Sequence, residues 1–384
     1  MEFRVPLYFL ALAVFAMGTS EFMLAGLVPG IAAAFAVSPA QAGYLTSAFA
    51  LGMVVGAPLM AALARSWRRR TALLCFLALF AVTHVVGGLT TSFAVLLGTR
   101  VPAAVSYAGF LAVALTAATG LARPGRALAV LLGGTTVACV AGVPGGALLD
   151  AAFGWRSAFW VVALLCLPAF AAVWWIPDTA AGAVPSGLRA ELGELRSLSG
   201  VLLLAALVNA ATFGVFTYLA PLAGGSAPAV LAAFGTGCFA GVTAAGRLAD
   251  RWPGQVVASG GPLLLAGWVV AALTAPGSAA LAGFAFVQGG LSFLVGSTVI
   301  ARILHLATGA PTMAGSYATA ALNAGATAGP VLAGALGGVV NPFWVAAVLV
   351  AVALVVGVVV RGAFTRAPGG PAAASTTRSP GRPR

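Results

Sequence analysis

The sequence predicts an all-helical integral membrane protein whose twelve transmembrane helices form two six-helix halves. Composition, a series of long apolar runs and an internal repeat support this prediction. Of the 384 residues, 61% are hydrophobic and 7% are charged, and the mean hydropathy is +1.07. Soluble domains are about half apolar and about a quarter charged, so a soluble globular domain is excluded. High hydrophobicity also excludes a disordered chain, and four cysteines are too few for a disulfide scaffold.

Twelve apolar runs are each long enough to cross a bilayer, which requires about 20 predominantly apolar residues per helix. The runs are unbroken, unlike the alternating segments of a membrane β-barrel. Twelve spans in 384 residues leave no room for a soluble domain. The predicted spans cover residues 6–28, 41–63, 71–90, 93–120, 127–149, 157–176, 199–221, 227–247, 256–275, 279–303, 311–337 and 341–360.

The net charge of +12 comes from 19 arginines, and the sequence contains no lysine. If the chain starts inside the cell, 17 arginines fall in cytoplasmic segments, Arg156 falls outside and Arg100 falls within a span. Basic residues accumulate on the cytoplasmic side of membrane proteins. We therefore expect a multi-pass protein of the cell membrane with both termini in the cytoplasm. The spread of the arginines along one rim argues against a nucleic-acid interface.

Two polar stretches divide the chain. Residues 177–198 carry interspersed acidic and basic side chains and are expected to form a short amphipathic cytoplasmic linker. This linker would join an N-terminal bundle, 1–176, to a C-terminal bundle, 199–360. Residues 361–384 are rich in Pro, Gly, Ser and Arg, a composition typical of a disordered tail.

The two bundles carry traces of a duplication. Arg65, after the second predicted span, and Arg251, after the eighth, are 186 residues apart. Pro144 in the fifth span and Pro330 in the eleventh are separated by the same offset. Parallel repeats in membrane transporters pack around a central path. The shared offset therefore indicates two similar halves on either side of such a path.

Two ionisable side chains, Glu21 and Arg100, fall deep inside predicted spans, where a charge costs at least about 2.5–3.5 kcal/mol. Both lie roughly 10 Å below the outer edge, counted at about 1.5 Å per residue. Burial favours the neutral form of a carboxyl, and a nearby arginine favours the charged form, so Glu21 is a candidate proton carrier. The alternatives are a fixed ion pair with Arg100 and a carboxyl held by the hydroxyls of Thr19 and Ser20.

Other polar and aromatic residues of the spans are weaker candidates for substrate binding. Each of them has two open interpretations. The amides could bind a ligand or bridge helices, and the aromatic rings could line a substrate cavity or pack in the core. The amides are Asn209, Gln288 and Asn323, and the aromatic residues are Tyr44, Tyr107, Phe216 and Tyr218. His84 and His305 stand alone in the sequence and predict no site.

Catalysis, metals and cofactors are not expected. Without lysine the chain cannot form the phosphate-binding loop of ATP-driven proteins. No Ser/His/Asp set converges, and each cysteine falls on a different span without the spacing of metal ligands. One proton moving inward supplies about 2.3 kcal/mol per 100 mV of membrane potential, which suits an embedded carboxyl.

Four segments carry a resemblance to a known family: 15–24 with its Gly-Thr-Ser-Glu, 45–53, 131–148 with its Gly-Val-Pro-Gly-Gly, and 315–323. In these segments, and nearly end to end, the sequence resembles the twelve-span drug:proton antiporters of the major facilitator superfamily. Among them it is most similar to the actinomycete chloramphenicol-resistance exporters. The resemblance implies the major facilitator fold.

The resemblance also implies roles for particular residues. Glu21 matches an embedded acid of the first span, and Arg100 matches a fourth-span arginine tied to proton transfer. Conformational roles are implied for the fifth-span glycine/proline motif and for the basic loops that follow the second and eighth spans, and the repeat adds Pro330. These residues are Gly133, Gly142, Pro144, Gly146, Arg69, Arg70, Asp250, Arg251 and Pro330.

The sequence departs from the family at two places. Ala64 stands where an acid usually precedes the first arginine of the loop, and Ala103 and Ala104 replace a Gln and a Gly after Arg100. The first departure puts the usual gating ion pair of the first half in doubt. Neither departure touches Glu21 or Arg100.

The expected function is proton-driven export of a small amphiphilic antibiotic, such as a phenicol, by a monomer in the lipid bilayer. Two alternatives stay open. One is export of a sugar or another metabolite by the same fold, and the other is a membrane sensor or scaffold that transports nothing.

Overall fold

A computed structural model describes residues 5–63, 67–121, 124–174, 188–249, 251–274, 277–307, 313–336 and 341–361. Within these ranges all regular secondary structure is helical, which confirms the predicted all-α class. Four expectations lie outside the described residues: the loop residues Ala64 and Arg65, the first part of the linker, Asp250, and the tail beyond Arg361.

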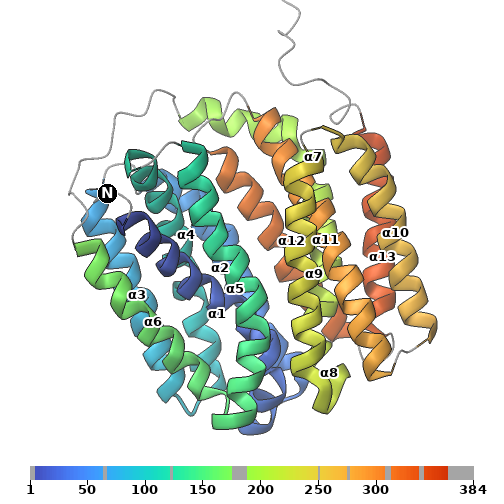
Figure 1. Ribbon diagram of the computed structural model, residues 1–384, viewed down its shortest axis with the longest axis horizontal. Helices are drawn as coiled ribbons and strands as arrows, with labels where there is room; N and C mark the ends of the chain where they lie inside the picture. Colours follow the sequence, from blue (N-terminus) through green and yellow to red (C-terminus); the bar gives the residue numbers. More distant parts are fainter. Residues whose placement is uncertain are drawn as a thin grey trace, which may run out of the picture.

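Each predicted span corresponds to a helix, although the seventh span, 199–221, is interrupted between α7 and α8. The N-terminal group, blue to green in Figure 1, consists of α1 (Val5–Phe35), α2 (Pro39–Leu63), α3 (Arg69–Leu89), α4 (Phe93–Leu121), α5 (Pro124–Phe153) and α6 (Arg156–Trp174). The C-terminal group, yellow-green to red, consists of α7 (Leu188–Phe216), α8 (Leu219–Ala223), the 3-10 turn η3 (Gly224–Ser226), α9 (Ala227–Leu248), α10 (Pro253–Thr274), α11 (Ser278–Leu306), α12 (Ala314–Leu336) and α13 (Pro342–Val359).

Two helices differ from the predicted bounds by more than about four residues. Helix α1 continues to Phe35, past the predicted end at residue 28, so Glu21 lies near its middle and deeper than expected. Helix α7 begins at Leu188, inside the predicted linker, and ends at Phe216. The described part of the linker is therefore continuous with the first span of the C-terminal group.

Within the described ranges, eleven helical segments are long and apolar enough to cross a membrane. Helix α12 is not among them because Gly, Ala, Thr and Asn make up much of its sequence. It contacts α2, α7, α11 and α13, so neighbouring helices cover much of its surface. Large apolar side chains on other helices point outward, for example Leu164 and Val355, as expected for contact with lipid.

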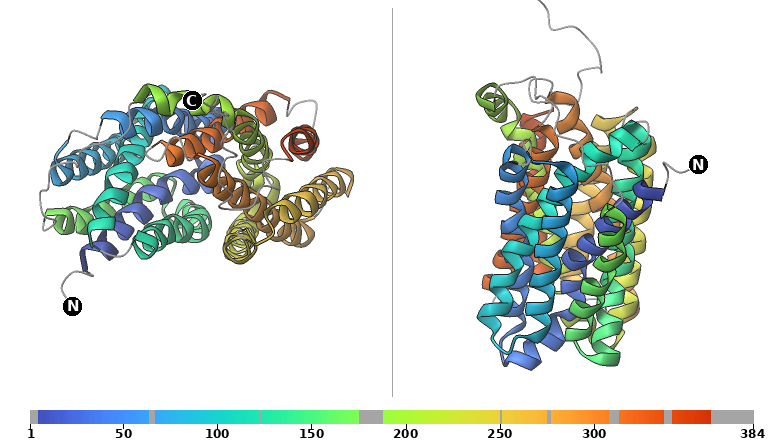
Figure 2. Two further views of the ribbon diagram at one scale, coloured as in Figure 1. Left: turned by 90° about the horizontal axis from the view of Figure 1, so that it is seen from above. Right: turned by 90° about the vertical axis from the view of Figure 1, so that its left-hand side faces the viewer.

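The two groups of helices repeat one another in space as well as in sequence. Adding 186 to the bounds of α1 to α6 gives the bounds of α7 and α9 to α13 to within five residues. The packing repeats too, because α5 packs against α1 as α12 packs against α7, and α4 packs against α2 as α11 packs against α9. Viewed from above, the two groups lie side by side (Figure 2). They meet where α2 contacts α12 and where α5 contacts α9.

Close packing of α1 against α5 depends on small residues on one face of α5. A Cβ atom added at Gly146 would lie 2.7 Å from the carbonyl oxygen of Met23 on α1, too close for a real contact. Gly329 of α12 meets the carbonyl oxygen of Ala210 on α7 in the same way. Small residues let membrane helices approach closely where no hydrophobic force drives association. The motif glycine Gly146 therefore sets the distance between α5 and the helix that carries Glu21.

Adjacent glycines of α5 offer a direct test of this packing. We expect Gly146→Ala to lower the thermal stability of the detergent-solubilised protein, because overpacking costs about 1–3 kcal/mol. Gly145→Ala is the matched control, since a Cβ there meets no atom within 4 Å. Thermal unfolding followed by size-exclusion chromatography compares the two variants. Equal unfolding temperatures would contradict the packing role of Gly146.

Candidate functional site

The structure brings α1 and α4 together at the level of the two embedded charges. Arg100 Nη1 donates a hydrogen bond of 3.0 Å to Ser20 Oγ, and Ser20 directly precedes Glu21. The side chain of Arg100 is fully buried among the N-terminal helices. Glu21 and Arg100 therefore lie at one depth in the bundle. The residue of α1 that contacts Arg100 is Ser20, however, and not Glu21.

Glu21 and Arg100 do not form an ion pair in this conformation. Consecutive residues of a helix point about 100° apart, so the contact of Ser20 with Arg100 directs Glu21 elsewhere. Among the described residues, no group forms a hydrogen bond or an ion pair with the Glu21 carboxyl. The hydroxyls expected to hold it are engaged elsewhere, because Thr19 donates to the Phe15 carbonyl at 2.8 Å and Ser20 contacts Arg100. The half-buried carboxyl is thus neither fixed in an ion pair with Arg100 nor held by the hydroxyls of Thr19 and Ser20.

Arg100 has hydrogen-bonding capacity left over. Its Nε and Nη2 atoms are buried without a hydrogen-bond partner, and its Cζ lies 4.9 Å from the centre of the Phe159 ring. A buried guanidinium is costly unless its donors are satisfied. The cation–π contact with Phe159 offsets only part of this cost. The unpaired donors make Arg100 a site for an acceptor that is not engaged in this conformation.

His84 on α3 completes the contacts around Ser20 and was not predicted as a site residue. Its Nε2 lies 2.6 Å from Ser20 Oγ, and its Nδ1 lies 2.7 Å from the carbonyl oxygen of Phe80. The side chain is fully buried. The sequence held one signal, since a histidine inside an apolar span needs a hydrogen-bond partner. It held no indication that the partner would be Ser20.

Tyr107 is the predicted aromatic residue nearest to this centre. It is buried, interacts electrostatically with Glu21, and its hydroxyl lies 3.4 Å from Thr135 Oγ1 on α5. Tyr107 thus places a polar group beside Glu21 on the side of α5. The structure brings together Glu21, Arg100 and Tyr107 from the predicted set and adds Ser20 and His84.

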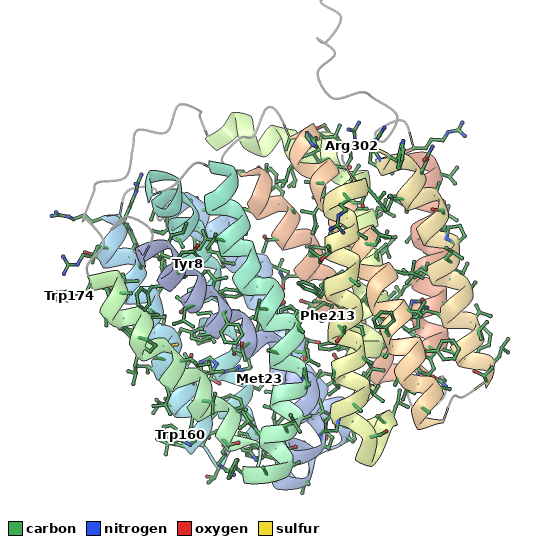
Figure 3. All side chains as sticks on the ribbon, viewed as in Figure 1. Tyr8, Met23, Trp160, Trp174, Phe213 and Arg302 are labelled. Atoms are coloured by element: carbon green, nitrogen blue, oxygen red, sulfur yellow. The ribbon has the colours of Figure 1, made fainter. Side chains whose placement is uncertain are left out.

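A row of phenylalanines leads from Glu21 across the boundary between the halves. Phe22 on α1 lies 6.4 Å, between ring centroids, from Phe213 on α7, which is seen between the two groups in Figure 3. Phe213 contacts Phe216 at 5.5 Å, and Phe216 stacks on Phe234 of α9 at 4.9 Å. Phe293 of α11 ends the row, 6.4 Å from Phe234. The sequence singled out only Phe216, because its partners become neighbours through tertiary packing.

The predicted amides bond to backbone carbonyls in this conformation. Asn209 donates to Leu322 at 2.6 Å and joins α7 to α12, while Gln288 donates to Leu264 at 3.0 Å and joins α11 to α10. Asn323 donates to Thr319 of its own helix at 2.9 Å. Of the two open interpretations, helix bridging describes Asn209 and Gln288 here. The buried Oδ1 of Asn323 and Oε1 of Gln288 have no hydrogen-bond partner.

Tyr44 and Tyr218 lie at one end of the bundle, away from Glu21. Helix α8, which begins directly after Tyr218, lies at the lower end of the bundle in Figure 1, and this end corresponds to the predicted outer side. Tyr218 donates a hydrogen bond of 3.0 Å to the carbonyl oxygen of Pro330 and interacts with Tyr44. Its hydroxyl packs against both Gly43 on α2 and Gly334 on α12. These residues join the two halves at the lower end.

The remaining motif residues occupy several places. Gly142 packs against Thr19 of α1, whereas no atom would meet a Cβ at Gly133. Pro144 and Pro330 lie inside α5 and α12. Arg70, beside Arg69 at the start of α3, lies with its Cζ 4.4 Å from the Trp174 ring, and Arg251 contacts Trp252 at 5.0 Å. Among the described residues no three His, Cys, Asp or Glu side chains gather into a metal site.

Two buried cysteines meet where α5 contacts α9. The thiols of Cys139 on α5 and Cys238 on α9 lie close enough to interact, so a pair of native side chains bridges the two halves. Both side chains are almost completely buried, at 1% and 3% exposure. Their proximity reports directly on the separation of the halves at this position.

Two repeated six-helix bundles with an embedded acid and arginine make up the architecture of a secondary transporter. The Major Facilitator Superfamily model matches residues 10–299, and the chain belongs to this superfamily. The chain is 56% identical over 383 residues to the chloramphenicol resistance protein of Streptomyces lividans, covering 94% of this chain and 98% of the relative. It is 30% identical to the inner membrane transport protein YdhP of Escherichia coli strain K12, over 81% of this chain and 83% of that one.

Solved structures show the same fold at low sequence identity. A bacterial homologue of the human lysosomal transporter Spinster, in an inward-facing and unoccupied conformation, superposes with a TM-score of 0.73 at 17% identity, covering 97% of this chain and 100% of that one. The human organic anion transporter MFSD10 superposes with a TM-score of 0.66 at 18% identity, covering 93% and 99%. The predicted family and fold class are therefore confirmed.

The cysteine pair permits a test of whether the halves must separate during the functional cycle. A membrane-permeant oxidant such as iodine should join Cys139 to Cys238, the two thiols losing two electrons to iodine and releasing two protons. We expect the cross-linked protein to lose transport and to recover it after reduction. A protease site placed in the linker would reveal the bond, because the halves would stay together on a denaturing gel. Cys139→Ala is the control, and full transport by the cross-linked protein would contradict the idea.

Proposed function

We propose that the chain exports a small amphiphilic antibiotic, with chloramphenicol or another phenicol as the best candidate, in exchange for protons. It would work as a monomer in the cell membrane, with both termini in the cytoplasm. One observation carries the proposal: a half-buried, unpaired carboxyl lies one residue from the hydroxyl that contacts a buried arginine with unused donors. Such a carboxyl can take up and release a proton without breaking a network that the fold requires.

The contacts support a route from proton binding to movement of the halves. Phe22 follows Glu21 directly and contacts Phe213 of the other half. A change in the separation of the halves therefore changes the surroundings of Glu21. In the proposed cycle Glu21 takes a proton from outside, the halves rock, and the proton leaves to the cytoplasm. Drug then binds, favours the deprotonated carboxyl and leaves outward when the halves rock back.

The substrate class follows from the relative and from the residues near Glu21. The Streptomyces lividans protein, whose name refers to chloramphenicol resistance, aligns over nearly the whole chain. The row from Phe22 to Phe293 offers aromatic surface between the halves, and Tyr107 adds a hydroxyl beside the carboxyl. A neutral molecule with an aromatic ring and hydroxyl groups suits such surroundings better than a highly charged one.

The energy source would be the proton gradient alone, without a cofactor, a metal or an enzymatic step. One proton entering the cell supplies about 2.3 kcal/mol per 100 mV, to which the pH gradient adds. Concentrating a drug tenfold on one side costs about 1.4 kcal/mol. A single proton per drug molecule therefore suffices for a gradient of that size.

The substrate and the energy source can be tested together in cells. Expression in a drug-sensitive host should raise tolerance to chloramphenicol and lower its accumulation, and an uncoupler should restore accumulation to the level of the empty vector. Sugar sensitivity should stay unchanged. Lower accumulation of a sugar, but not of the drug, would favour the metabolite exporter. No change for any solute would favour a membrane sensor or scaffold.

The role of Glu21 can be tested in proteoliposomes. We expect Glu21→Gln to abolish drug-dependent proton movement, because the amide occupies the same volume but cannot bind or release the proton. Glu21→Asp is the matched control and should retain part of the exchange. A pH jump across the membrane would start the measurement. Exchange of drug and proton by Glu21→Gln at the wild-type rate would overturn the coupling role.

A further inference from the structure

A buried set of polar contacts joins three helices of the N-terminal half behind Glu21. Ser20 on α1 contacts both Arg100 on α4, at 3.0 Å, and His84 on α3, at 2.6 Å. All three side chains have no exposed surface. Phe159 of α6 covers the set, since its ring lies 4.9 Å from Arg100 Cζ and 5.8 Å from the His84 ring. The hydroxyl of Ser20 is thus shared between an imidazole and a guanidinium.

The geometry indicates a neutral imidazole. The Phe80 carbonyl can only accept, so Nδ1 of His84 carries a hydrogen. The positive charge of Arg100 disfavours a second proton on the ring, and Nε2 is then an acceptor. Ser20 then donates its hydrogen to Nε2, and its oxygen accepts from Arg100. A protonated imidazole would turn Nε2 into a donor and place a second positive charge beside Arg100. Arg100 on α4 is the charged group that acts on His84, while α1 presents the Ser20 hydroxyl and α6 presents Phe159.

The fold does not require these polar contacts. Helices α7, α10 and α11 are the counterparts of α1, α3 and α4 in the second half and pack in the same arrangement. Helix α10 carries no ionisable side chain, and those of α11 are confined to its last turns, at Arg302 and His305. Those of α7 lie in its first part, within 189–196. Polar groups buried at membrane depth are costly and mark functional sites.

We propose that His84 is a positioning residue of the transport cycle, acting as a neutral acceptor. It orients the Ser20 hydroxyl, and Ser20 in turn holds one arm of Arg100. This contact fixes the guanidinium and leaves its Nε and Nη2 atoms free to donate to a carboxylate. The carboxylate at the same level of α1 is that of Glu21 after it loses its proton. This role rests on the proposed proton exchange. It gives His84 a role in that exchange which neither the sequence pattern nor the names of the related proteins indicate.

Two substitutions at one position separate the acceptor from the imidazole. His84→Leu removes the acceptor, whereas the amide oxygen of His84→Gln can still accept from Ser20 and cannot carry the proton of an imidazole. The full-length protein in proteoliposomes, with chloramphenicol as the probe, gives the rate of drug-driven proton movement over a range of pH. The amount of protein in membranes and its unfolding temperature in detergent show whether each variant folds.

We expect His84→Leu to exchange protons at least about tenfold more slowly, because a hydrogen bond that orients a charged group is lost. His84→Gln should stay within about threefold of the wild type and keep the same pH profile. Full activity of His84→Leu would overturn the proposal. A His84→Gln variant as slow as His84→Leu would also overturn it, since the imidazole proton itself would then be needed.

A second pair of variants keeps the test decisive if His84→Leu does not fold. Ser20→Ala should lose exchange as His84→Leu does, and Ser20→Thr, which keeps the hydroxyl, should retain it. Equal activity of the two Ser20 variants would overturn the positioning role. Wild-type protein that moves chloramphenicol without protons would overturn the proposed function instead. Wild-type coupling together with a fully active His84→Leu would overturn only the role of His84.

Discussion

The guanidinium of Arg100 is a full positive charge inside an apolar bundle, and the centre of the N-terminal half is arranged around it. Burial of such a group is unfavourable unless hydrogen bonds and opposite charges compensate. Ser20 and Phe159 supply one hydrogen bond and one aromatic face, which leaves two nitrogen atoms without acceptors. A carboxylate on α1 could accept from these two atoms and so reduce the remaining free-energy cost of burying the guanidinium. In the proposed cycle, Arg100 would thereby link the protonation state of Glu21 to the packing of four helices.

Close helix packing is the second condition for this arrangement. Glu21, Ser20 and Phe22 are consecutive residues of α1, so each points in a different direction. Ser20 faces Arg100, and Phe22 faces Phe213 of the other half. The glycine face of α5 holds α1 at short distance, which keeps these three directions defined. Loosening that contact would affect the arginine, the carboxyl and the boundary between the halves together.

The two halves share a fold but differ in the ionisable and aromatic side chains that they bury. The offset of 186 residues relates their helices, and glycines in α5 and α12 serve the same packing purpose. The embedded acid, arginine and histidine lie only in the first half of the described chain, whereas the second half supplies most of the phenylalanine row. One half therefore carries the groups that respond to protons in the proposed cycle, and the other offers aromatic surface.

Apolar runs and arginine positions determined the number and predicted orientation of the helices, because a bilayer demands about 20 apolar residues per span whatever the neighbours are. Glu21 and Arg100 were also evident from sequence, since each is a costly exception within such a run. Only the tertiary structure decided that the two are unpaired and that His84 contacts Ser20. Residues 20, 84 and 100 lie on three helices, and no one-dimensional pattern sets the rotation of each helix about its axis. That rotation depends on which small residues meet, as at Gly146 and Met23, and therefore on the packing of the whole bundle.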